Sequence, residues 1–228
     1  MMSTELAREQ MVGQQVRAWD VLSERVLSTL RALPRELFVP QSQQHLAYAD
    51  IAVPLAHGQH MLRPVIAGRL LQALALTGTE RVLEIGTGSG FLCACLAANA
   101  ASVRSLEILP DLAEAARSSL AAAGVRNAEV VTADAVAEAA AYTAGDAAGD
   151  PGHFDAVVLT ASLPVYDPRF ARALKVGGRL LAAVGTAPVM EVCLVQRMAQ
   201  DTWQRSFLFE TVLDPLLNAV RPEAFSFF

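Results

Sequence analysis

Cysteine, basic residues and long apolar runs are all scarce in this 228-residue chain. The chain has only 3 cysteines, an odd number that provides no disulfide framework and is typical of a reducing compartment. Its 18 Lys and Arg are outnumbered by 23 Asp and Glu, so the net charge is −5 and the basic surplus of a nucleic-acid-binding protein is missing. The apolar stretch from Val65 to Leu76 is interrupted by Arg69 and falls short of the ~18 residues that a membrane span needs.

The start of the chain also lacks a secretory signal, because Met1 to Met11 has charged residues and no apolar segment. We therefore expect a cytoplasmic protein that binds neither nucleic acid nor membranes. No pair of its histidines has the H-x-x-x-H spacing of a zinc site, and Cys93 and Cys95 face different sides of a predicted helix. The sequence therefore predicts no metal site.

Glycines are concentrated in the segment Val82–Phe91, which reads V-L-E-I-G-T-G-S-G-F. Apolar residues before and after the glycines predict a strand, a tight turn and a helix. Glycine allows a positive φ and a close approach of the backbone to a ligand, and the N-terminus of the following helix has free N–H groups. A dinucleotide-binding turn would read G-x-G-x-x-G, but here the third glycine, Gly90, comes one residue early.

The pattern E-x-G-x-G-x-G instead resembles motif I of the S-adenosylmethionine-dependent methyltransferases. The alternative is a purely structural turn between a strand and a helix in another α/β domain. The methyltransferase interpretation predicts that the following residues form part of the cofactor site: Glu84, Gly86, Thr87, Gly88 and Gly90.

Two acidic residues at the ends of later strands support the nucleotide interpretation. Glu107 follows Gly90 by 17 positions, close to the spacing at which an acid accepts hydrogen bonds from ribose hydroxyls. Asp134 ends the strand that begins near Ala128, a position that lies near the adenine in the methyltransferase fold. Asp134 is also suited to capping a helix, and one residue can serve both roles.

Strands and helices alternate from Arg81 onward, which predicts a mostly parallel sheet covered on both faces by helices. The predicted strands are Arg81–Ile85, Val103–Ile108, Ala128–Thr132, Phe154–Thr160, Gly178–Val184, Met190–Arg197 and Phe207–Leu213. The predicted helices are Ser89–Ala101, Asp111–Ala123, Ala135–Tyr142 and Pro168–Leu174. No helix separates the last two strands, so they are expected to form an antiparallel hairpin. A surface loop is predicted at Gly145–Gly152.

The N-terminal third is predicted to be helical and then irregular. Apolar spacing favours a helix over Glu5–Leu33, and Pro34 and Pro40 then break the pattern. Residues Ala47–Pro64 are predicted to form a loop, followed by a helix over Pro64–Leu76.

Several segments, in order, resemble the protein-L-isoaspartate O-methyltransferase family over roughly Glu5 to Gly185. They are M-V-x-x-Q-V-R from Met11, L-P-R-E-L-F-V-P from Leu33, A-Y-A-D from Ala47, Gly58-Gln59, the glycine motif, Phe154-Asp155 and L-K-x-G-G-R-L from Leu174.

The resemblance implies a Rossmann-like class I methyltransferase fold with a seven-stranded sheet in a single domain, residues 1–228. Residues 1–76 would form a helical and loop region on the substrate side, and residues 77–228 the S-adenosyl-L-methionine-binding core. The implied reaction is methylation of isoaspartyl α-carboxyls in damaged proteins or peptides, followed by spontaneous succinimide formation. The resemblance also implies that Gln59, His60 and Ala135 belong to the cofactor site.

The loop that should carry the family's serine departs from the pattern. The family reads approximately G-x-T-I-S-x-P there, whereas this chain has Gly58–Pro64 with His60 at the threonine position and Leu62 at the serine position. Leucine cannot hydrogen-bond a substrate carboxylate. The glycine that follows the third-strand acid in the family is replaced by Ala135, and the C-terminal residues from Phe209 to Phe228 do not match the family's ending.

His60 and Arg63 are therefore the candidate catalytic residues. Arg63 is suited to holding a carboxylate through paired hydrogen bonds, whereas a neutral His60 can act as a general base toward a hydroxyl. Both can equally be surface residues of a loop. Tyr48 and Asp50 are weaker candidates for the site wall, since loop packing explains them as well.

Three functions remain open. The first is isoaspartyl methylation with an altered loop, and the second is methylation of another small carboxylate or hydroxyl acceptor on the same scaffold. The third is a non-catalytic protein that retains cofactor binding.

Overall fold

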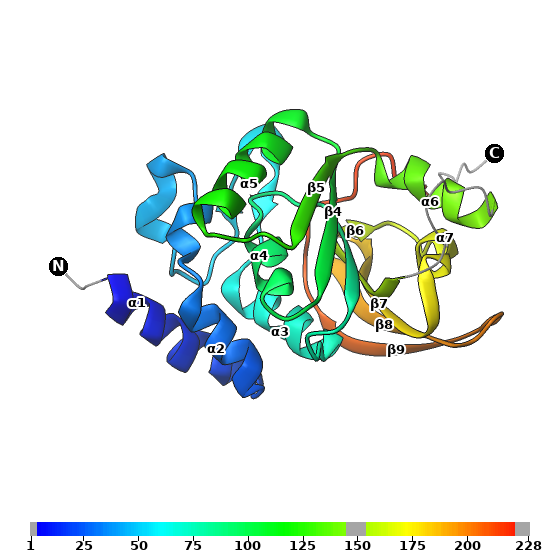
Figure 1. The fold of residues 1–228 in the computed structure, drawn as a ribbon, viewed down its shortest axis with the longest axis horizontal. Helices are drawn as coiled ribbons and strands as arrows, with labels where there is room; N and C mark the ends of the chain where they lie inside the picture. The colour runs from blue at the N-terminus through cyan, green and yellow to red at the C-terminus, as the bar shows by residue number, and fades with distance from the viewer. Residues whose placement is uncertain (1–3, 145–153, 222–228) are drawn as a thin grey trace.

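The computed structural model describes residues 4–144 and 154–221, which form a seven-stranded sheet between two layers of helices (Figure 1). The strand order is β5-β4-β3-β6-β7-β8-β9. The pairs from β5 to β7 are parallel, and β8 and β9 add antiparallel pairs at one edge. The prediction of a mostly parallel sheet with a terminal antiparallel hairpin is confirmed. The sheet comprises β3 (Arg81–Ile85), β4 (Ser102–Glu107), β5 (Ala128–Thr132), β6 (Phe154–Leu163), β7 (Leu174–Thr186), β8 (Val189–Ala199) and β9 (Thr202–Glu210).

The helices cover the two faces of the sheet in separate groups. Figure 1 shows α3, α4 and α5 on one face and α6 and α7 on the other. Their apolar residues form two clusters, one on each side, because the strands are buried on both faces. The bounds are α3 (Pro64–Leu74), α4 (Phe91–Ala97), α5 (Pro110–Ala122), α6 (Ala135–Ala144) and α7 (Pro168–Arg172).

The N-terminal region corrects one prediction. Instead of one helix over Glu5–Leu33, α1 (Thr4–Gln10) continues into a wide π turn and a 3₁₀ turn, and α2 (Glu24–Ala32) follows. Asp20 ends the first part with a φ of 62°, a left-handed conformation that Asp tolerates better than most residues. The break allows Met11 and Val16 to be buried in the same cluster as Leu27.

Several predicted boundaries also differ. The last strand was expected at Phe207–Leu213, but β9 is Thr202–Glu210, because a tight turn at Gln200 and Asp201 starts the returning strand earlier. Residues Thr211–Arg221 therefore leave the sheet, and we call this segment the tail. The predicted loop Ala47–Pro64 is mainly irregular but contains a two-stranded pair, β1 (Val53–Pro54) with β2 (His60–Met61). The predicted loop Gly145–Gly152 lies outside the described residues.

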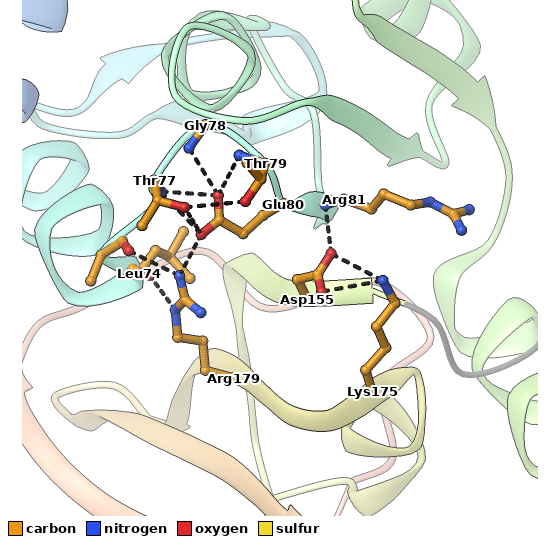
Figure 2. A network of polar contacts seen from close by, with 10 residues as sticks. Leu74, Thr77, Gly78, Thr79, Glu80, Arg81, Asp155, Lys175 and Arg179 are labelled. Carbon is orange, nitrogen blue, oxygen red and sulfur yellow. Dashed lines mark hydrogen bonds and ion pairs between the residues drawn. The ribbon is translucent and has the colours of Figure 1, made fainter.

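A polar network ties the amino ends of the strands together (Figure 2). The carboxylate of Glu80 accepts hydrogen bonds from the main-chain N–H groups of Thr77, Gly78 and Thr79 and pairs with Arg179 on β7. Burial alone would raise the pKa of Glu80, but these donors outweigh it and hold the pKa at about 2. The ionised carboxylate thus fixes the turn that leads into β3.

A second carboxylate completes the network in Figure 2. Asp155 accepts from the main-chain N–H of Arg81 at 2.8 Å and pairs with Lys175 at 3.2 Å. The Phe154-Asp155 and Lys175 to Arg179 segments therefore join β3, β6 and β7 at the end opposite their carboxyl ends. This stabilisation leaves the carboxyl ends of the strands free to form a site.

Candidate active site

A pocket lies at the carboxyl ends of β3, β4 and β5. Its wall is formed by the glycine turn, the strand-end acids and the tail. We call it the nucleoside pocket; its lining includes Gln59, His60, Gly86, Gly88, Glu107, Asp134, Ala135, Thr160 and the tail residues Asp214–Leu217. The structure thus brings together seven of the ten residues for which the sequence predicted cofactor contact.

The glycine turn is shaped by its neighbours on the sheet. Gly86 has a φ of +90°, and a Cβ atom there would lie 2.4 Å from Thr160 Oγ1. The Thr160 hydroxyl instead donates to the carbonyl of Gly86 at 2.6 Å. Gly90 has a φ of +84° and packs against Ala116 of α5, where a Cβ atom would come within 3.2 Å. Both positions therefore require glycine for close packing as well as for conformation.

Glu107 is held in place by the same turn. The side chain is only 5% exposed, and its carboxylate accepts from the main-chain N–H of Gly88 at 2.8 Å and of Leu109 at 3.1 Å. A carboxylate has about four lone-pair positions, so acceptor capacity remains for a ligand. An acceptor-only group on a pocket wall suits a pair of ribose hydroxyls, which are donors.

Asp134 caps a helix and also lines the pocket. Its Oδ1 accepts from the main-chain N–H of Val136 at 2.8 Å at the start of α6, as an N-terminal cap does. Its Oδ2 accepts from the side-chain amide of Asn218 in the tail at 2.9 Å. The two roles that the sequence left open are compatible in this geometry.

Glu84 does not line the pocket, contrary to the prediction. It is completely buried beneath the glycine turn, where the Ser105 hydroxyl donates to it at 2.5 Å. The Ser105 hydroxyl also lies 2.6 Å from that of Thr87, which is likewise absent from the pocket wall. Burial raises the pKa of Glu84 to about 8 and outweighs the Ser105 bond. Glu84 therefore supports the turn from below, since it precedes the turn on β3 and points into the core, while Thr87 bonds to the same Ser105 and Gly90 packs against α5.

A second and larger pocket adjoins the first. It has a volume of about 920 Å³ and lies between β2 with the residues that follow it, the end of β6, the turn from β7 to β8 and the tail. We call it the acceptor pocket. Leu62 and Arg63 line it, together with Trp19, Met190 and Arg221. His60, Thr160, Asp214 and Pro215 line both pockets, so any group passing from one pocket to the other must pass them.

His60 is fixed to the tail at this boundary. Its main-chain N–H donates to Asp214 Oδ2 at 2.7 Å, and its ring Nδ1 lies 3.1 Å from the same oxygen. The tail in turn pairs with the end of β6, where the N–H of Ser162 donates to the carbonyl of Asp214 at 2.8 Å. Sequence reasoning missed Asp214 and Thr160, because neither stands in a local motif.

Arg63, the other predicted catalytic residue, is already paired. Its guanidinium donates to Asp50 and stacks on the ring of Trp19 at 5.9 Å. Tyr48 lies elsewhere, donating to Glu36 and accepting from Arg8, and lines neither pocket. Of the two weaker candidates, Asp50 thus orients Arg63, whereas Tyr48 belongs to loop packing.

The residues of the nucleoside pocket fit S-adenosylmethionine. Glu107 provides acceptors for ribose hydroxyls, Ile108, Leu109 and Leu112 provide an apolar surface for a flat base, and the glycine turn leaves its backbone accessible. Among the described residues, no group of three or more His, Cys, Asp or Glu side chains is arranged to hold a metal ion. In the same part of the chain, no helix is long and apolar enough to cross a membrane.

Comparisons with known proteins agree with this geometry. The family model for protein-L-isoaspartate(D-aspartate) O-methyltransferase matches residues 7–218. A protein-L-isoaspartate O-methyltransferase of Methanoculleus marisnigri is 40% identical over 86% of this chain and 94% of its own length. Another, from Pelobacter propionicus, is 35% identical over 94% of this chain and 92% of its own length.

A solved structure confirms the fold. A Plasmodium falciparum protein described as a beta-aspartate methyltransferase, in complex with S-adenosyl-L-homocysteine, has a TM-score of 0.74, 18% identity, and a match covering 92% of this chain and 97% of that one. The wide coverage includes the N-terminal region as well as the sheet. Together, the family match and the curated relatives show that the chain belongs to the protein-L-isoaspartate(D-aspartate) O-methyltransferase family.

Proposed function

We propose that this protein is an S-adenosylmethionine-dependent methyltransferase that methylates the α-carboxyl of isoaspartyl residues in proteins or peptides. The observation that carries the proposal is the junction of two pockets at His60 and Thr160 in a chain of this family. One pocket has the groups that a nucleoside needs, and the other is large enough for a peptide segment. Methyl transfer requires the two reactants to meet at such a boundary.

The chemistry places modest demands on the protein. When bound, S-adenosylmethionine supplies an electrophilic methyl group on its sulfonium. The acceptor carboxylate is already ionised near neutral pH, so no strong base is needed. The protein has to hold one carboxylate oxygen in line with the methyl group and keep water out.

Two residues are placed to hold the acceptor. Arg63 lines the acceptor pocket and stays oriented by Asp50, so it can offer N–H donors to a carboxylate. His60 is fixed at Nδ1 by Asp214, and its Nε2 has no partner among the described residues. In this geometry Arg63 and His60 provide polar contacts that the leucine at position 62 cannot.

The product ester decomposes without further help from the protein. The neighbouring main-chain amide nitrogen attacks the methyl ester, the C–O bond breaks and methanol leaves, which forms a succinimide. Hydrolysis of the succinimide then yields a mixture that includes the normal aspartyl linkage, and this outcome constitutes repair.

A second candidate is methylation of another acceptor on the same scaffold. Leu62 favours it, because an apolar side chain occupies the pocket wall where the family has a serine. A hydroxyl acceptor would use His60 as general base, since a bond from Nδ1–H to Asp214 leaves Nε2 free to accept a proton. Retention of cofactor binding without turnover is a third candidate.

We also propose a cytoplasmic location and protein substrates rather than nucleic acid. Cys93, Cys95 and Cys193 are all free and buried, which suits a reducing compartment. The net charge of −5 is unfavourable for binding polyanions.

The decisive experiment is transfer of labelled methyl groups from S-adenosylmethionine to two peptides that differ only in an isoaspartyl or aspartyl linkage. We expect label in the isoaspartyl peptide alone and release of labelled methanol at mildly basic pH. Binding of S-adenosylhomocysteine is measured in the same sample. If the cofactor product binds and neither peptide is labelled, the proposal is wrong and the second candidate takes its place.

A further inference from the structure

Arg35 is a completely buried cation that forms no direct ion pair with a carboxylate among the described residues. It is 0% exposed, at the start of the short 3₁₀ segment Arg35–Phe38. Within residues 4–144 and 154–221, no Asp or Glu forms an ion pair with it, whereas Arg8, Arg63 and Arg179 all have one. Burial of an unpaired charge is costly, so such a residue points to a missing anion.

The contacts that Arg35 does make use only part of its guanidinium. Nε donates to the carbonyl of Ala47 at 2.8 Å, and Nη2 donates to the carbonyl of Leu62 at 2.7 Å. The guanidinium also lies over the ring of Phe91 at 4.7 Å. Nη1 is buried and has no hydrogen-bond partner in the part of the chain that the structure describes. Burial lowers the pKa of Arg35 to about 10, which leaves it protonated at neutral pH.

Arg35 is one of the residues that line a small cavity beside the glycine turn. This cavity, of about 40 Å³, is lined by Arg35, Leu62 and Phe91 together with Gly86 to Ser89 of the glycine turn. It shares His60, Gly86, Gly88 and Thr160 with the nucleoside pocket. Glu107 and Asp134 line only the nucleoside pocket, and Arg35 lines only the small cavity. The path from the ribose position past the glycine turn therefore leads toward Arg35.

We propose that Arg35 Nη1 binds the carboxylate of the amino-acid portion of S-adenosylmethionine. Guanidinium groups match carboxylates in charge and in hydrogen-bond geometry, and the ligand would provide the direct carboxylate contact that Asp50, which pairs with Arg63, does not. Because Nη2 of the same group holds the carbonyl of Leu62, the bond connects the cofactor to the loop that faces the acceptor. The proposal rests on the proposed function only for the identity of the cofactor.

The test compares two ligands that differ in this carboxylate alone. S-adenosylhomocysteine and its decarboxylated form share the adenosine, the thioether and the ammonium group. We expect titration calorimetry to show that wild-type protein binds S-adenosylhomocysteine at least about tenfold more tightly than the decarboxylated form. A hydrogen bond between charged groups contributes an affinity difference of this size. In Arg35→Gln the ratio of the two affinities should fall to about one. In Arg35→Lys the ratio should lie between one and the wild-type value.

Arg179→Gln is the matched control. Arg179 also donates to main-chain carbonyls, those of Leu74 and Ala75, but at the amino ends of the strands (Figure 2). Its substitution should lower stability and leave the affinity ratio at the wild-type value. This control separates loss of a carboxylate ligand from loss of an arginine that holds carbonyl groups.

Two results would overturn the proposal. One is that the wild type binds both ligands with equal affinity. The other is that Arg35→Gln weakens the binding of both ligands by the same factor, which would mean that Arg35 only supports the loop. If Arg35→Gln does not fold, a crystal structure of the wild type with S-adenosylhomocysteine decides, because the carboxylate must lie within about 3.2 Å of Nη1. The affinity ratio does not depend on the acceptor, so failure of isoaspartyl methylation would leave this result unchanged.

Discussion

Asp214 holds His60 at two points, although the two residues are 154 positions apart in the sequence. One carboxylate oxygen accepts the main-chain N–H of His60 at 2.7 Å and lies 3.1 Å from its ring Nδ1. An aspartate in this position fixes the orientation and tautomer of an imidazole. The tail thereby sets the geometry of the residue that stands between the nucleoside and acceptor pockets.

Substitution of Asp214 should therefore impair methyl transfer. We expect Asp214→Ala to lower kcat/KM about tenfold or more, because His60 loses both bonds. Asp214→Asn should lower kcat/KM less, since the side-chain carbonyl of asparagine still accepts from the main-chain N–H of His60. Asp201→Ala, at the exposed turn between β8 and β9, is the control. Equal activity of Asp214→Ala and Asp201→Ala would contradict this role.

Restoration of the family's serine should help an isoaspartyl acceptor. Leu62→Ser is expected to raise kcat/KM for the isoaspartyl peptide about tenfold, since a hydroxyl can donate to the acceptor carboxylate. Leu62→Ala enlarges the pocket to a similar degree without adding a donor, and it should give no gain. If Leu62→Ser and Leu62→Ala have the same kcat/KM, the hydroxyl does not bind the substrate carboxylate. That result would support the second candidate function.

Removal of the strand-end acid should weaken the binding of the cofactor. Glu107→Ala deletes the acceptor for Gly88 and Leu109 and for the predicted ribose contact, so we expect S-adenosylhomocysteine to bind about 10–100-fold less tightly. Titration calorimetry measures the change. Glu114→Ala, exposed on α5, serves as control. An unchanged affinity in Glu107→Ala would remove Glu107 from the cofactor site.

Glu84 should make stability depend on pH in an unusual direction. Its pKa is raised to about 8 in the folded protein, so between about pH 4.5 and 8 the folded state keeps a proton that the unfolded state releases. Stability thus falls as the pH rises through this range. Glu84→Gln lacks this pH dependence. As the pH rises, the free energy of unfolding of Glu84→Gln relative to that of the wild type should therefore increase by up to about 1.4 kcal/mol per pH unit. Urea unfolding at pH 5, 6 and 7 tests this, and a constant difference would contradict it.

Glu80 should show the opposite dependence. Its pKa of about 2 lies below the unfolded value, so its stabilisation is complete above about pH 4.5 and is lost as the pH falls toward 2. We expect Glu80→Gln to lower the free energy of unfolding by about 2 kcal/mol at pH 7 and by much less at pH 3. Glu129→Gln, exposed on β5, is the control for a general charge effect.

The sheet core could be predicted because its signals are local. The apolar strand before Gly86, the glycines of the turn and the acid at the end of β4 each require only neighbouring residues to interpret. The prediction of one long first helix was wrong because it also relied on local signals alone. Apolar spacing continues through Met11 and Val16, whereas the left-handed residue at Asp20, which ends that segment, gives only a weak sequence signal.

The candidate site was predicted less completely, because its remaining residues meet only in the folded chain. Asp214 and Thr160 gain their roles from contacts with His60 and Gly86 that no sequence spacing indicates. Glu84 was assigned to the pocket from the motif alone, and burial on β3 places it in the core instead. Arg35 was part of the family resemblance, but only its complete burial singles it out.

The position of the tail in the chain has a consequence for biosynthesis. Residues up to Glu210 contain every strand of the sheet, and they leave the ribosome before Thr211–Arg221 do. Since Asp214 and Asn218 hold His60 and Asp134 from this segment, both pockets acquire their final walls only after all the described strands have been synthesised. A nascent chain can thus assemble its sheet while it still lacks a finished catalytic site.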